Sequence, residues 1–207
     1  QRAAKWEERA NRLERFASVA AHDIRNPLEV ADIRLEAARD SHEDVHFEKV
    51  AGSLDRIQQI VEDVLSVGGE SIEPNAEVAV NECAEEAWDT VDTADATLTA
   101  PTTLPAVRAD RSRLQQLFEN LFRNAVEHGG RDVTVTVGSL PDGFYVADNG
   151  GGIPEEERDR VFEASYSTTD DNTGLGLAIV KQIAEAHGWH VGLTSADSGG
   201  ARFEFTG

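Results

Sequence analysis

A histidine near the start of the chain has neighbours that suit phosphoryl-group chemistry. His22 is followed directly by Asp23, and Asn26 lies four residues after the histidine. A neutral imidazole nitrogen is a nucleophile, and an adjacent carboxylate can set its tautomer and orientation. Because residues four apart share a helix face, Asn26 could hold a water molecule against a phosphorylated ring. Pro27 lies inside a helical sequence at a cost of about 3 kcal/mol, which indicates that the segment serves a function.

Two asparagines form a second pair with the potential for chemistry. Asn120 and Asn124 lie four residues apart within residues 113–128, whose apolar pattern predicts an amphipathic helix. The two side chains therefore share one helix face. Carboxamide oxygens are suitable ligands for Mg²⁺, an ion that keeps several waters and bridges phosphate groups. We interpret this face as a candidate site for a metal ion and the phosphates beside it.

Two glycine-rich segments are suited to binding a nucleotide. Asp148 follows a predicted strand and precedes Gly150, Gly151 and Gly152. A carboxylate there could accept a hydrogen bond from the exocyclic amine of adenine, while the glycines let a planar base approach the backbone. Further on, residues 173–177 open a predicted helix with two glycines. Amide groups exposed at a helix N-terminus bind phosphate.

The first 67 residues are predicted to form two long antiparallel helices joined by a polar turn at residues 40–44. Apolar side chains recur at helical spacing in two stripes, and the first stripe sets His22 on the opposite, solvent-facing side. A lone hairpin cannot cover its own apolar seam, so we expect a four-helix bundle made by two chains. The stripes contain Leu13, Phe16, Ala20, Ile24, Ala31, Leu35, Ala38, Val50, Leu54, Ile57, Val61 and Val64.

The chain after the hairpin changes to a mixed α and β pattern, so the fold class is α+β. Glycines 68 and 69 end the second helix and, with Pro74, mark residues 68–77 as a linker. Residues 78–207 then form a second domain, in which a sheet carries helices on one face. The predicted strands are 78–80, 132–140, 144–147, 190–194 and 201–205, and the predicted helices are 81–91, 113–128 and 174–187.

The composition is strongly acidic. The net charge is −20, with 39 Asp and Glu residues, and lysine occurs only at Lys5, Lys49 and Lys181. Such a surface repels phosphate backbones, so nucleic-acid binding is not expected. We interpret the charge as an adaptation to high salt, with an acidic protein of an ordinary habitat as the alternative. Cys83, the single cysteine, excludes an intrachain disulfide and is expected to be a buried thiol.

Taken together, these motifs resemble those of the sensor histidine kinase family. They occur in the order that the family shows and cover both halves of the chain. The H-box is matched by residues 22–28, the N-box by 120–128, the first glycine box by 148–154, the F-box by 161–169, the flexible ATP lid by 154–172 and the second glycine box by 173–180.

The resemblance implies a protein-histidine kinase whose second domain, residues 78–207, is an ATP-binding α/β sandwich of the Bergerat type, shared with gyrase-like ATPases. His22 would be phosphorylated from ATP and pass the phosphate to an Asp of a response regulator. Asp23 would assist as a proton acceptor, and Asn26 would support dephosphorylation of the regulator. Mg²⁺ would be held by Asn120 and Asn124. The nucleotide site would comprise Asn120, Asn124, Glu127, His128, Asp148, Gly150, Gly152, Ile153, Thr173, Gly174, Leu175, Gly176 and Leu177.

The sequence departs from the family pattern in the lid and near the C-terminus. Asn172 and Asp170 stand where many relatives carry Gly and Lys, and Ala201 stands where many carry Ser or Thr. Because residues 166–172 of the lid contain no basic residue, a counter-charge for phosphate must come from Mg²⁺, Arg123, Lys181 or elsewhere. These departures predict slow turnover or weak ATP affinity.

Two other functions compete with the kinase. A gyrase-like ATPase would need a Glu base at the position of Asn120, whereas Glu119 lies about 100° around the helix. A degenerate kinase could act only as a phosphatase or a binding scaffold. His187 and His190, at a helix end, are too few for a metal site and are expected to be structural.

The chain contains no Met, so we expect it to be a piece of a longer protein. No secretory signal opens it, and no apolar run reaches the length of about 20 residues that spans a membrane. We therefore expect a cytoplasmic fragment, with any membrane anchor upstream. The expected partners are a second copy of the chain and a response regulator.

Overall fold

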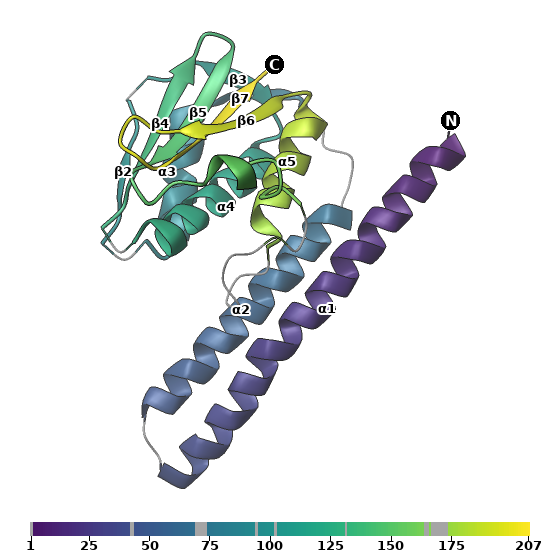
Figure 1. Cartoon of the computed structure of the whole chain (residues 1–207), viewed down its shortest axis with the longest axis vertical. Coiled ribbons are helices and arrows are strands. Elements are labelled where there is room, and N and C mark those ends of the chain that lie inside the picture. Colours follow the sequence, from purple (N-terminus) through teal and green to yellow (C-terminus); the bar gives the residue numbers. More distant parts are fainter. Residues whose placement is uncertain are drawn as a thin grey trace. The chain divides into compact units, whose positions relative to one another are not determined.

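The computed structural model describes residues 2–41, 44–68, 74–93, 95–101, 103–130, 132–163, 166 and 174–207. Within the first two helices, the side chains of residues 2–16, 19, 22, 40–41, 59 and 62–68 lie outside this description. The chain divides into two compact units, one built on the helical hairpin and one on the sheets. Each unit is described by itself below, and Figure 1 labels its elements.

The two predicted long helices are confirmed. Helix α1 (Arg2–Ser41) and helix α2 (Asp44–Gly68) lie side by side and run in opposite directions (Figure 1). Pro27 is buried inside α1, and α2 ends at Gly68 as expected from glycine's preference for helix termini. The turn between the helices, at residues 42 and 43, lies outside the described residues.

The apolar stripes are only partly buried within this hairpin. Small side chains occupy much of its described interior: Ala20, Ala31, Ala38 and Ser53 are buried together with Ile60. Larger apolar side chains face outward on the single chain. They are Leu28, Val30, Ile33, Leu35, Val45, Phe47, Leu54 and Val61, each at least 36 % exposed. The hairpin thus leaves an apolar surface uncovered, as expected for half of a bundle.

The second unit contains two sheets. Its five-stranded sheet has the order β2-β4-β5-β7-β6, in which β2 pairs parallel to β4 and the other pairs are antiparallel. Its two-stranded sheet pairs β1 with β3 in antiparallel register. The strands are β1 (Ala76–Ala79), β2 (Thr97–Thr99), β3 (Ala106–Ala109), β4 (Thr134–Leu140), β5 (Gly143–Asp148), β6 (His190–Ser195) and β7 (Ala201–Thr206).

Three helices pack beside one another against one face of the larger sheet, as predicted (Figure 1). They are α3 (Val80–Thr90), α4 (Arg111–Gly129) and α5 (Gly176–His187), with α4 in contact with both of the others. The short strands β2 and β3 and the 3₁₀ helix η1 (Glu155–Glu157) were not predicted. Elements of three or four residues are too short to show a periodic apolar pattern.

Aromatic side chains form the centre of the core between sheet and helices. Phe118 of α4 lies 5.6 Å from both Phe122 and Phe144, measured between ring centroids. Phe144 in turn stacks on Phe205 of β7 at 4.9 Å. These rings are at most 1 % exposed. Burying four such rings supplies much of the hydrophobic stabilisation that holds α4 on the sheet.

Helix α4 is fixed at its N-terminus by two interactions. The Asp110 carboxylate caps the helix by accepting hydrogen bonds from the backbone N–H groups of Ser112 and Arg113. The backbone N–H of Asp110 donates to Nε2 of His187 at 3.0 Å. Nδ1 of His187 therefore carries the proton and donates to the Ile183 carbonyl at 2.8 Å. His187 thus has the structural role that was expected, because it ties α5 to α4.

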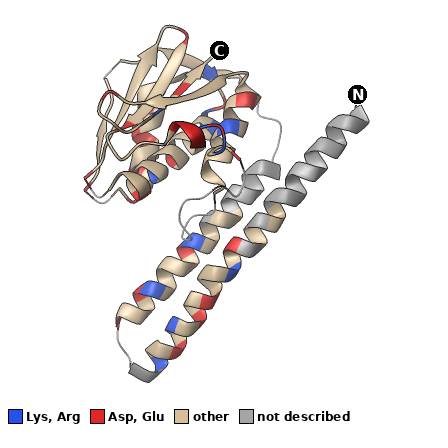
Figure 2. Ribbon diagram, viewed as in Figure 1, with Lys and Arg blue, Asp and Glu red and all other residues tan. Residues whose placement is uncertain are grey.

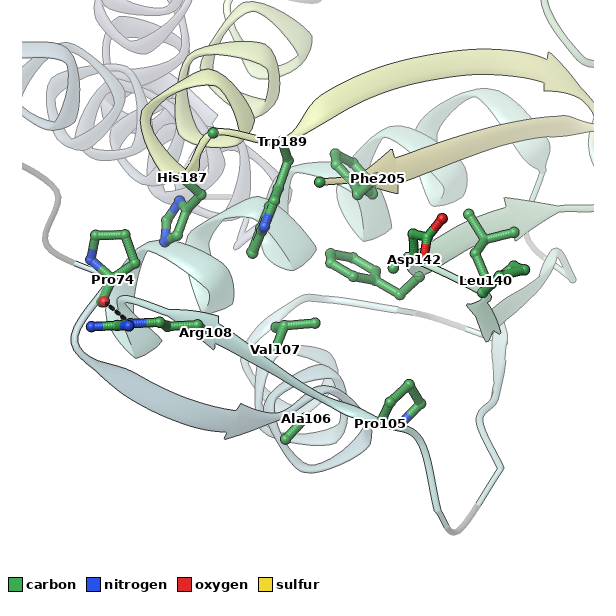
Figure 3. Close-up of a pocket in the computed structure, with 15 residues that line it drawn as sticks. Pro74, Pro105, Ala106, Val107, Arg108, Leu140, Asp142, His187, Trp189 and Phe205 are labelled. Carbon is green, nitrogen blue, oxygen red and sulfur yellow. Dashed lines mark hydrogen bonds between the residues drawn. The ribbon is translucent and has the colours of Figure 1, made fainter.

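A groove lies at the other end of β5 from Asp148 (Figure 3). Its volume is about 640 Å³, and the ring of His187 stacks on Trp189 at 4.5 Å along its wall. Nε of Arg108 donates to the Pro74 carbonyl at 3.0 Å, as Figure 3 shows. This bond ties β3 to Pro74, two residues before β1, and does not involve the glycine-rich segments.

Acidic side chains are distributed over helices and turns of both units, and basic side chains lie among them (Figure 2). Cys83 is buried in α3, as predicted, and its burial raises the pKa of the thiol to about 12 although the Arg111 charge lowers it. No helix within the described residues is long and apolar enough to cross a membrane.

The Asp110 cap predicts an acid-dependent loss of stability. Burial opposes ionisation of this carboxyl, but the hydrogen bonds from Ser112 and Arg113 and the Arg113 charge outweigh it, so its pKa lies below the ordinary value. The stabilisation is present above the unfolded pKa of about 3.9 and is lost as the pH falls through the lower folded value. We expect Asp110→Ala to reduce the free energy of unfolding by about 1 kcal/mol at neutral pH.

Urea unfolding at neutral and acidic pH measures this difference. The exposed Asp159→Ala variant is the control and should change stability by less than about 0.5 kcal/mol. A difference between wild type and Asp110→Ala that did not shrink on acidification below pH ~4 would contradict the capping role.

Candidate functional site

Asp148, the last residue of β5, is buried and held by backbone groups. Its Oδ1 atom accepts hydrogen bonds from the N–H of Gly150 at 2.8 Å and the N–H of Ala201 at 3.3 Å. The Ser198 hydroxyl donates to the Asp148 carbonyl at 3.1 Å. The described hydrogen bonds to the carboxylate all reach Oδ1, which leaves Oδ2 to accept a hydrogen bond from a ligand.

The turn between β6 and β7 closes against Asp148. A Cβ atom on Gly200 would lie 2.2 Å from both the carbonyl oxygen and Oδ1 of Asp148, so only glycine fits at this position. Gly152 has φ +71°, and a Cβ there would lie 3.0 Å from the Gly199 carbonyl oxygen. The sequence predicts strands 190–194 and 201–205 on either side of this turn, but not its contact with Asp148. The glycine pair was the one sequence signal that could have indicated a close backbone approach.

Asn120 lies at the centre of α4 and faces the N-terminus of α5. Its side-chain Nδ2 donates to the Gln116 carbonyl at 2.9 Å, which orients the amide. Its Oδ1 lies 3.1 Å from the position that a Cβ on Gly176 would occupy. The second glycine segment is therefore in contact with the buried asparagine. Gly174, which precedes α5, has φ +62° and needs glycine for the same reason as Gly152.

The first glycine segment packs against the other end of α4. A Cβ on Gly150 would lie 2.6 Å from the Cα of Gly129, the last residue of the helix. Together with the Asn120–Gly176 contact, this brings both glycine segments and Asp148 around one helix. Asn124 is half-buried one turn beyond Asn120, whereas Glu127 and His128 are exposed near the helix end.

The remaining predicted site residues belong to the two glycine boxes. Ile153, Leu175 and Leu177 are described, but Thr173 and residues 167–172 of the lid lie outside the described residues. In the F-box segment, Val161 is buried and the ring of Phe162 lies 6.3 Å from that of Phe203. Nζ of Lys181 lies 6.0 Å from the centroid of the Phe162 ring.

The candidate phospho-acceptor segment lies within α1. The helix continues through His22, whose side chain is outside the described residues, so its predicted orientation stays a prediction. Asp23 is half-buried, Asn26 is exposed and Pro27 is buried. The helical backbone places Asn26 one turn beyond His22, as the spacing predicted.

Comparison with protein families matches both units separately. Residues 12–68 match the model of the "His Kinase A (phospho-acceptor) domain", and residues 109–206 match that of the "Histidine kinase-, DNA gyrase B-, and HSP90-like ATPase". The chain belongs to the sensor histidine kinase family. Its hairpin is the phospho-acceptor domain of this family, and its sheet domain is the ATPase-type domain.

Relatives with known roles resemble the chain over nearly its whole length. It is 33 % identical to the sensor histidine kinase ZraS of Klebsiella oxytoca, over 99 % of this chain and 48 % of that protein. It is 30 % identical to the adaptive-response sensory kinase SasA of Parasynechococcus marenigrum, over 96 % of this chain and 57 % of that protein. The chain therefore spans about half the length of these relatives.

A solved structure also covers both units. The chain is 25 % identical to the histidine kinase ThkA in a crystal structure of its complex with the response regulator protein TrrA, with a TM-score of 0.69. The match covers 99 % of this chain and 66 % of the other. The fold predicted from the sequence, a helical hairpin followed by an α/β ATP-binding sandwich, is confirmed.

Glu119 does not lie where a gyrase-like catalytic base would be needed. Its Oε1 accepts hydrogen bonds from the Thr90 hydroxyl at 3.1 Å and from Nε2 of Gln115 at 3.0 Å. The carboxylate is thus directed toward α3, while Asn120 faces the glycine segment at α5. This geometry favours the kinase over a hydrolysing ATPase of the gyrase type.

The close contact at Gly200 predicts a strong effect of one added methyl group. In Gly200→Ala the new Cβ must displace the Asp148 backbone and carboxylate, so we expect ATP affinity to fall by about tenfold or more and stability to fall by about 1–3 kcal/mol. Titration calorimetry with ATP measures the affinity. Gly52→Ala in α2 is the matched control, because a Cβ there also meets nothing within 4 Å, and it should bind ATP like the wild type. Equal affinities of the two variants would contradict the proposed geometry.

Proposed function

We propose that this chain phosphorylates its own His22 with ATP and then transfers the phosphate to an Asp of a response regulator. One observation carries the proposal. Asp148 and both glycine segments lie around helix α4, which carries Asn120, and the same chain contains a phospho-acceptor hairpin. The family membership supports the same reaction. The active form that we infer is a homodimer.

The nucleotide contacts follow from the groups that remain available. Oδ2 of Asp148 would accept a hydrogen bond from the exocyclic amine of adenine, since the described bonds to this carboxylate reach Oδ1. Asn120 is suited to hold Mg²⁺, because the bond from Nδ2 to the Gln116 carbonyl turns its Oδ1 toward the α5 N-terminus. Asn124 would assist from the next turn. When bound, Mg²⁺ neutralises charge on the phosphates.

The residues of the hairpin would carry the transfer itself. A neutral nitrogen of His22 attacks the γ-phosphorus of ATP, a P–N bond forms, and the bond to the β–γ bridging oxygen breaks to release ADP. Asp23 would hold the proton on the other ring nitrogen and stabilise the charge that develops on the imidazole. Positioning and charge neutralisation supply most of the acceleration in such phosphoryl transfers.

Substitution of His22 tests the reaction directly. We expect wild type incubated with γ-labelled ATP and Mg²⁺ in high salt to gain an acid-labile, alkali-stable label, and His22→Gln to gain none. His190→Gln is the control, since His190 is exposed at the start of β6 and should leave labelling unchanged. Absence of label on wild type with ATP binding intact would instead favour a phosphatase or scaffold.

The homodimer is supported by the pattern of exposed apolar side chains. On α1, Leu28 and Leu35 are seven residues apart, and on α2 the same spacing joins Phe47, Leu54 and Val61. A seven-residue repeat keeps these side chains on one seam of each helix. Two hairpins that join these seams would form a four-helix bundle and remove them from water.

Phosphatase action toward the regulator is a second proposed activity, and it assigns Asn26 the role of orienting a water molecule. The exposed carboxamide one turn beyond His22 supports it. We expect Asn26→Ala to keep autophosphorylation within about twofold and to slow dephosphorylation of a receiver domain by about tenfold or more. The receiver would be one that accepts label from this chain in a phosphotransfer screen. Equal dephosphorylation rates with wild type and variant would disprove the assignment.

We further propose that the chain works in a cytoplasm of high salt concentration. The proposed salt concentration rests on the net charge of −20. Carboxylates at this density repel one another, and salt screens that repulsion over a few ångströms.

A further inference from the structure

We propose that Arg158 is a positioning residue that sets the adenine selectivity of the nucleotide site. The inference rests on the proposed function of Asp148 as the group that binds the base. Arg158 directly follows η1, at the beginning of the lid region, and was not among the residues predicted to serve the site. Its guanidinium joins the end of the first glycine box, at Ile153, to the end of β6, at Ser195.

The Nε atom of Arg158 bonds to the end of the first glycine box. Nε donates to the Ile153 carbonyl at 3.2 Å. Ile153 follows Gly152, which requires a positive φ of +71° and packs against the Gly199 carbonyl. Pro154 comes next and has no N–H to donate. The Arg158 bond therefore restrains a segment whose own backbone offers few ways to hold it.

The Nη2 atom of Arg158 bonds to the β6–β7 hairpin, which contacts Asp148. Nη2 of Arg158 donates to the Ser195 hydroxyl at 2.8 Å. Ser195 ends β6 and is paired in register with Ala201 of β7. The N–H of Ala201 is one of the two backbone donors to Oδ1 of Asp148. Through this pairing, the guanidinium fixes the strand end that in turn orients the carboxylate.

Both hydrogen bonds depend on the planar geometry of the arginine guanidinium. The guanidinium is planar and presents several N–H donors in a rigid fork, so a single side chain can serve two acceptors in different elements. A lysine has one nitrogen on a flexible stem and cannot hold both acceptors in the same way. Loss of the fork would let the 152–154 segment and the β6–β7 turn move apart, and Asp148 would lose a fixed orientation.

The consequence is a loss of discrimination rather than a uniform loss of binding. A carboxylate held in place accepts a hydrogen bond from the amine of adenine, whereas guanine offers a carbonyl oxygen at that position and is repelled. A site built to bind an N–H group discriminates strongly against an analogue without it. A carboxylate that can turn away would discriminate less. We therefore expect Arg158→Ala to weaken ATP binding about fivefold while GTP binding changes less than twofold.

The experiment measures the dissociation constants of MgATP and MgGTP for the 207-residue chain by titration calorimetry. Arg108→Ala is the matched control, because it removes the same charge and a similar bond, from Nε to the Pro74 carbonyl, at the other end of β5. We expect it to keep the ATP-to-GTP preference of the wild type. Arg158→Lys should restore part of the preference, and Ser195→Ala should lose part of it.

The outcomes separate this inference from the proposed function. Asp148→Asn tests the base contact itself: if wild type shows no preference for ATP, or Asp148→Asn keeps the preference, the nucleotide assignment fails and the role of Arg158 fails with it. If Asp148→Asn loses the preference but Arg158→Ala keeps it, the inference alone is wrong. Should Arg158→Ala not fold, judged by its thermal unfolding, Ser195→Ala decides in its place. An equal weakening of ATP and GTP would reduce Arg158 to a structural role.

Discussion

The sheet domain is organised around the placement of one buried carboxylate. A carboxylate removed from water is costly unless hydrogen bonds replace its hydration, and backbone N–H groups from two separate loops meet this need at Asp148. Those loops can come so close only because Gly150 and Gly200 carry no side chain. These contacts reach Oδ1, so in the proposed function Oδ2 accepts the hydrogen bond from the base. Structure and ligand recognition therefore share one set of interactions.

Helix α4 is the frame that relates the carboxylate to the rest of the site. Its first turn is capped by Asp110 and tied to α5 through His187, its middle carries Asn120, and its last residue, Gly129, packs against Gly150. The stacked phenylalanines of the core hold this helix on the sheet. Because one helix contacts both glycine segments, it fixes the spacing between the groups that we propose bind the base and the phosphates.

The helical hairpin differs from the sheet domain in where its apolar side chains lie. Alanines in its interior let two helices approach closely, and the larger apolar side chains remain outside. On a surface with a net charge of −20, these side chains are the feature that would favour association, because two such acidic chains repel one another by charge. Apolar burial would have to overcome that repulsion, and salt would weaken it. In the proposed homodimer, assembly and salt concentration are therefore linked.

The sequence by itself determined the long elements and the motif residues. Helices α1, α2, α4 and α5 have enough turns to show their apolar period, and the motif around Asp148 predicted a contact with the base. Tertiary structure alone decided the short strands β2 and β3, because three or four residues carry no period and depend on a partner strand. It alone also brought the Ser198 hydroxyl and the Ala201 N–H to Asp148. Ser198 and Ala201 bond to a residue 50 and 53 positions away, and no local spacing encodes a contact over that distance.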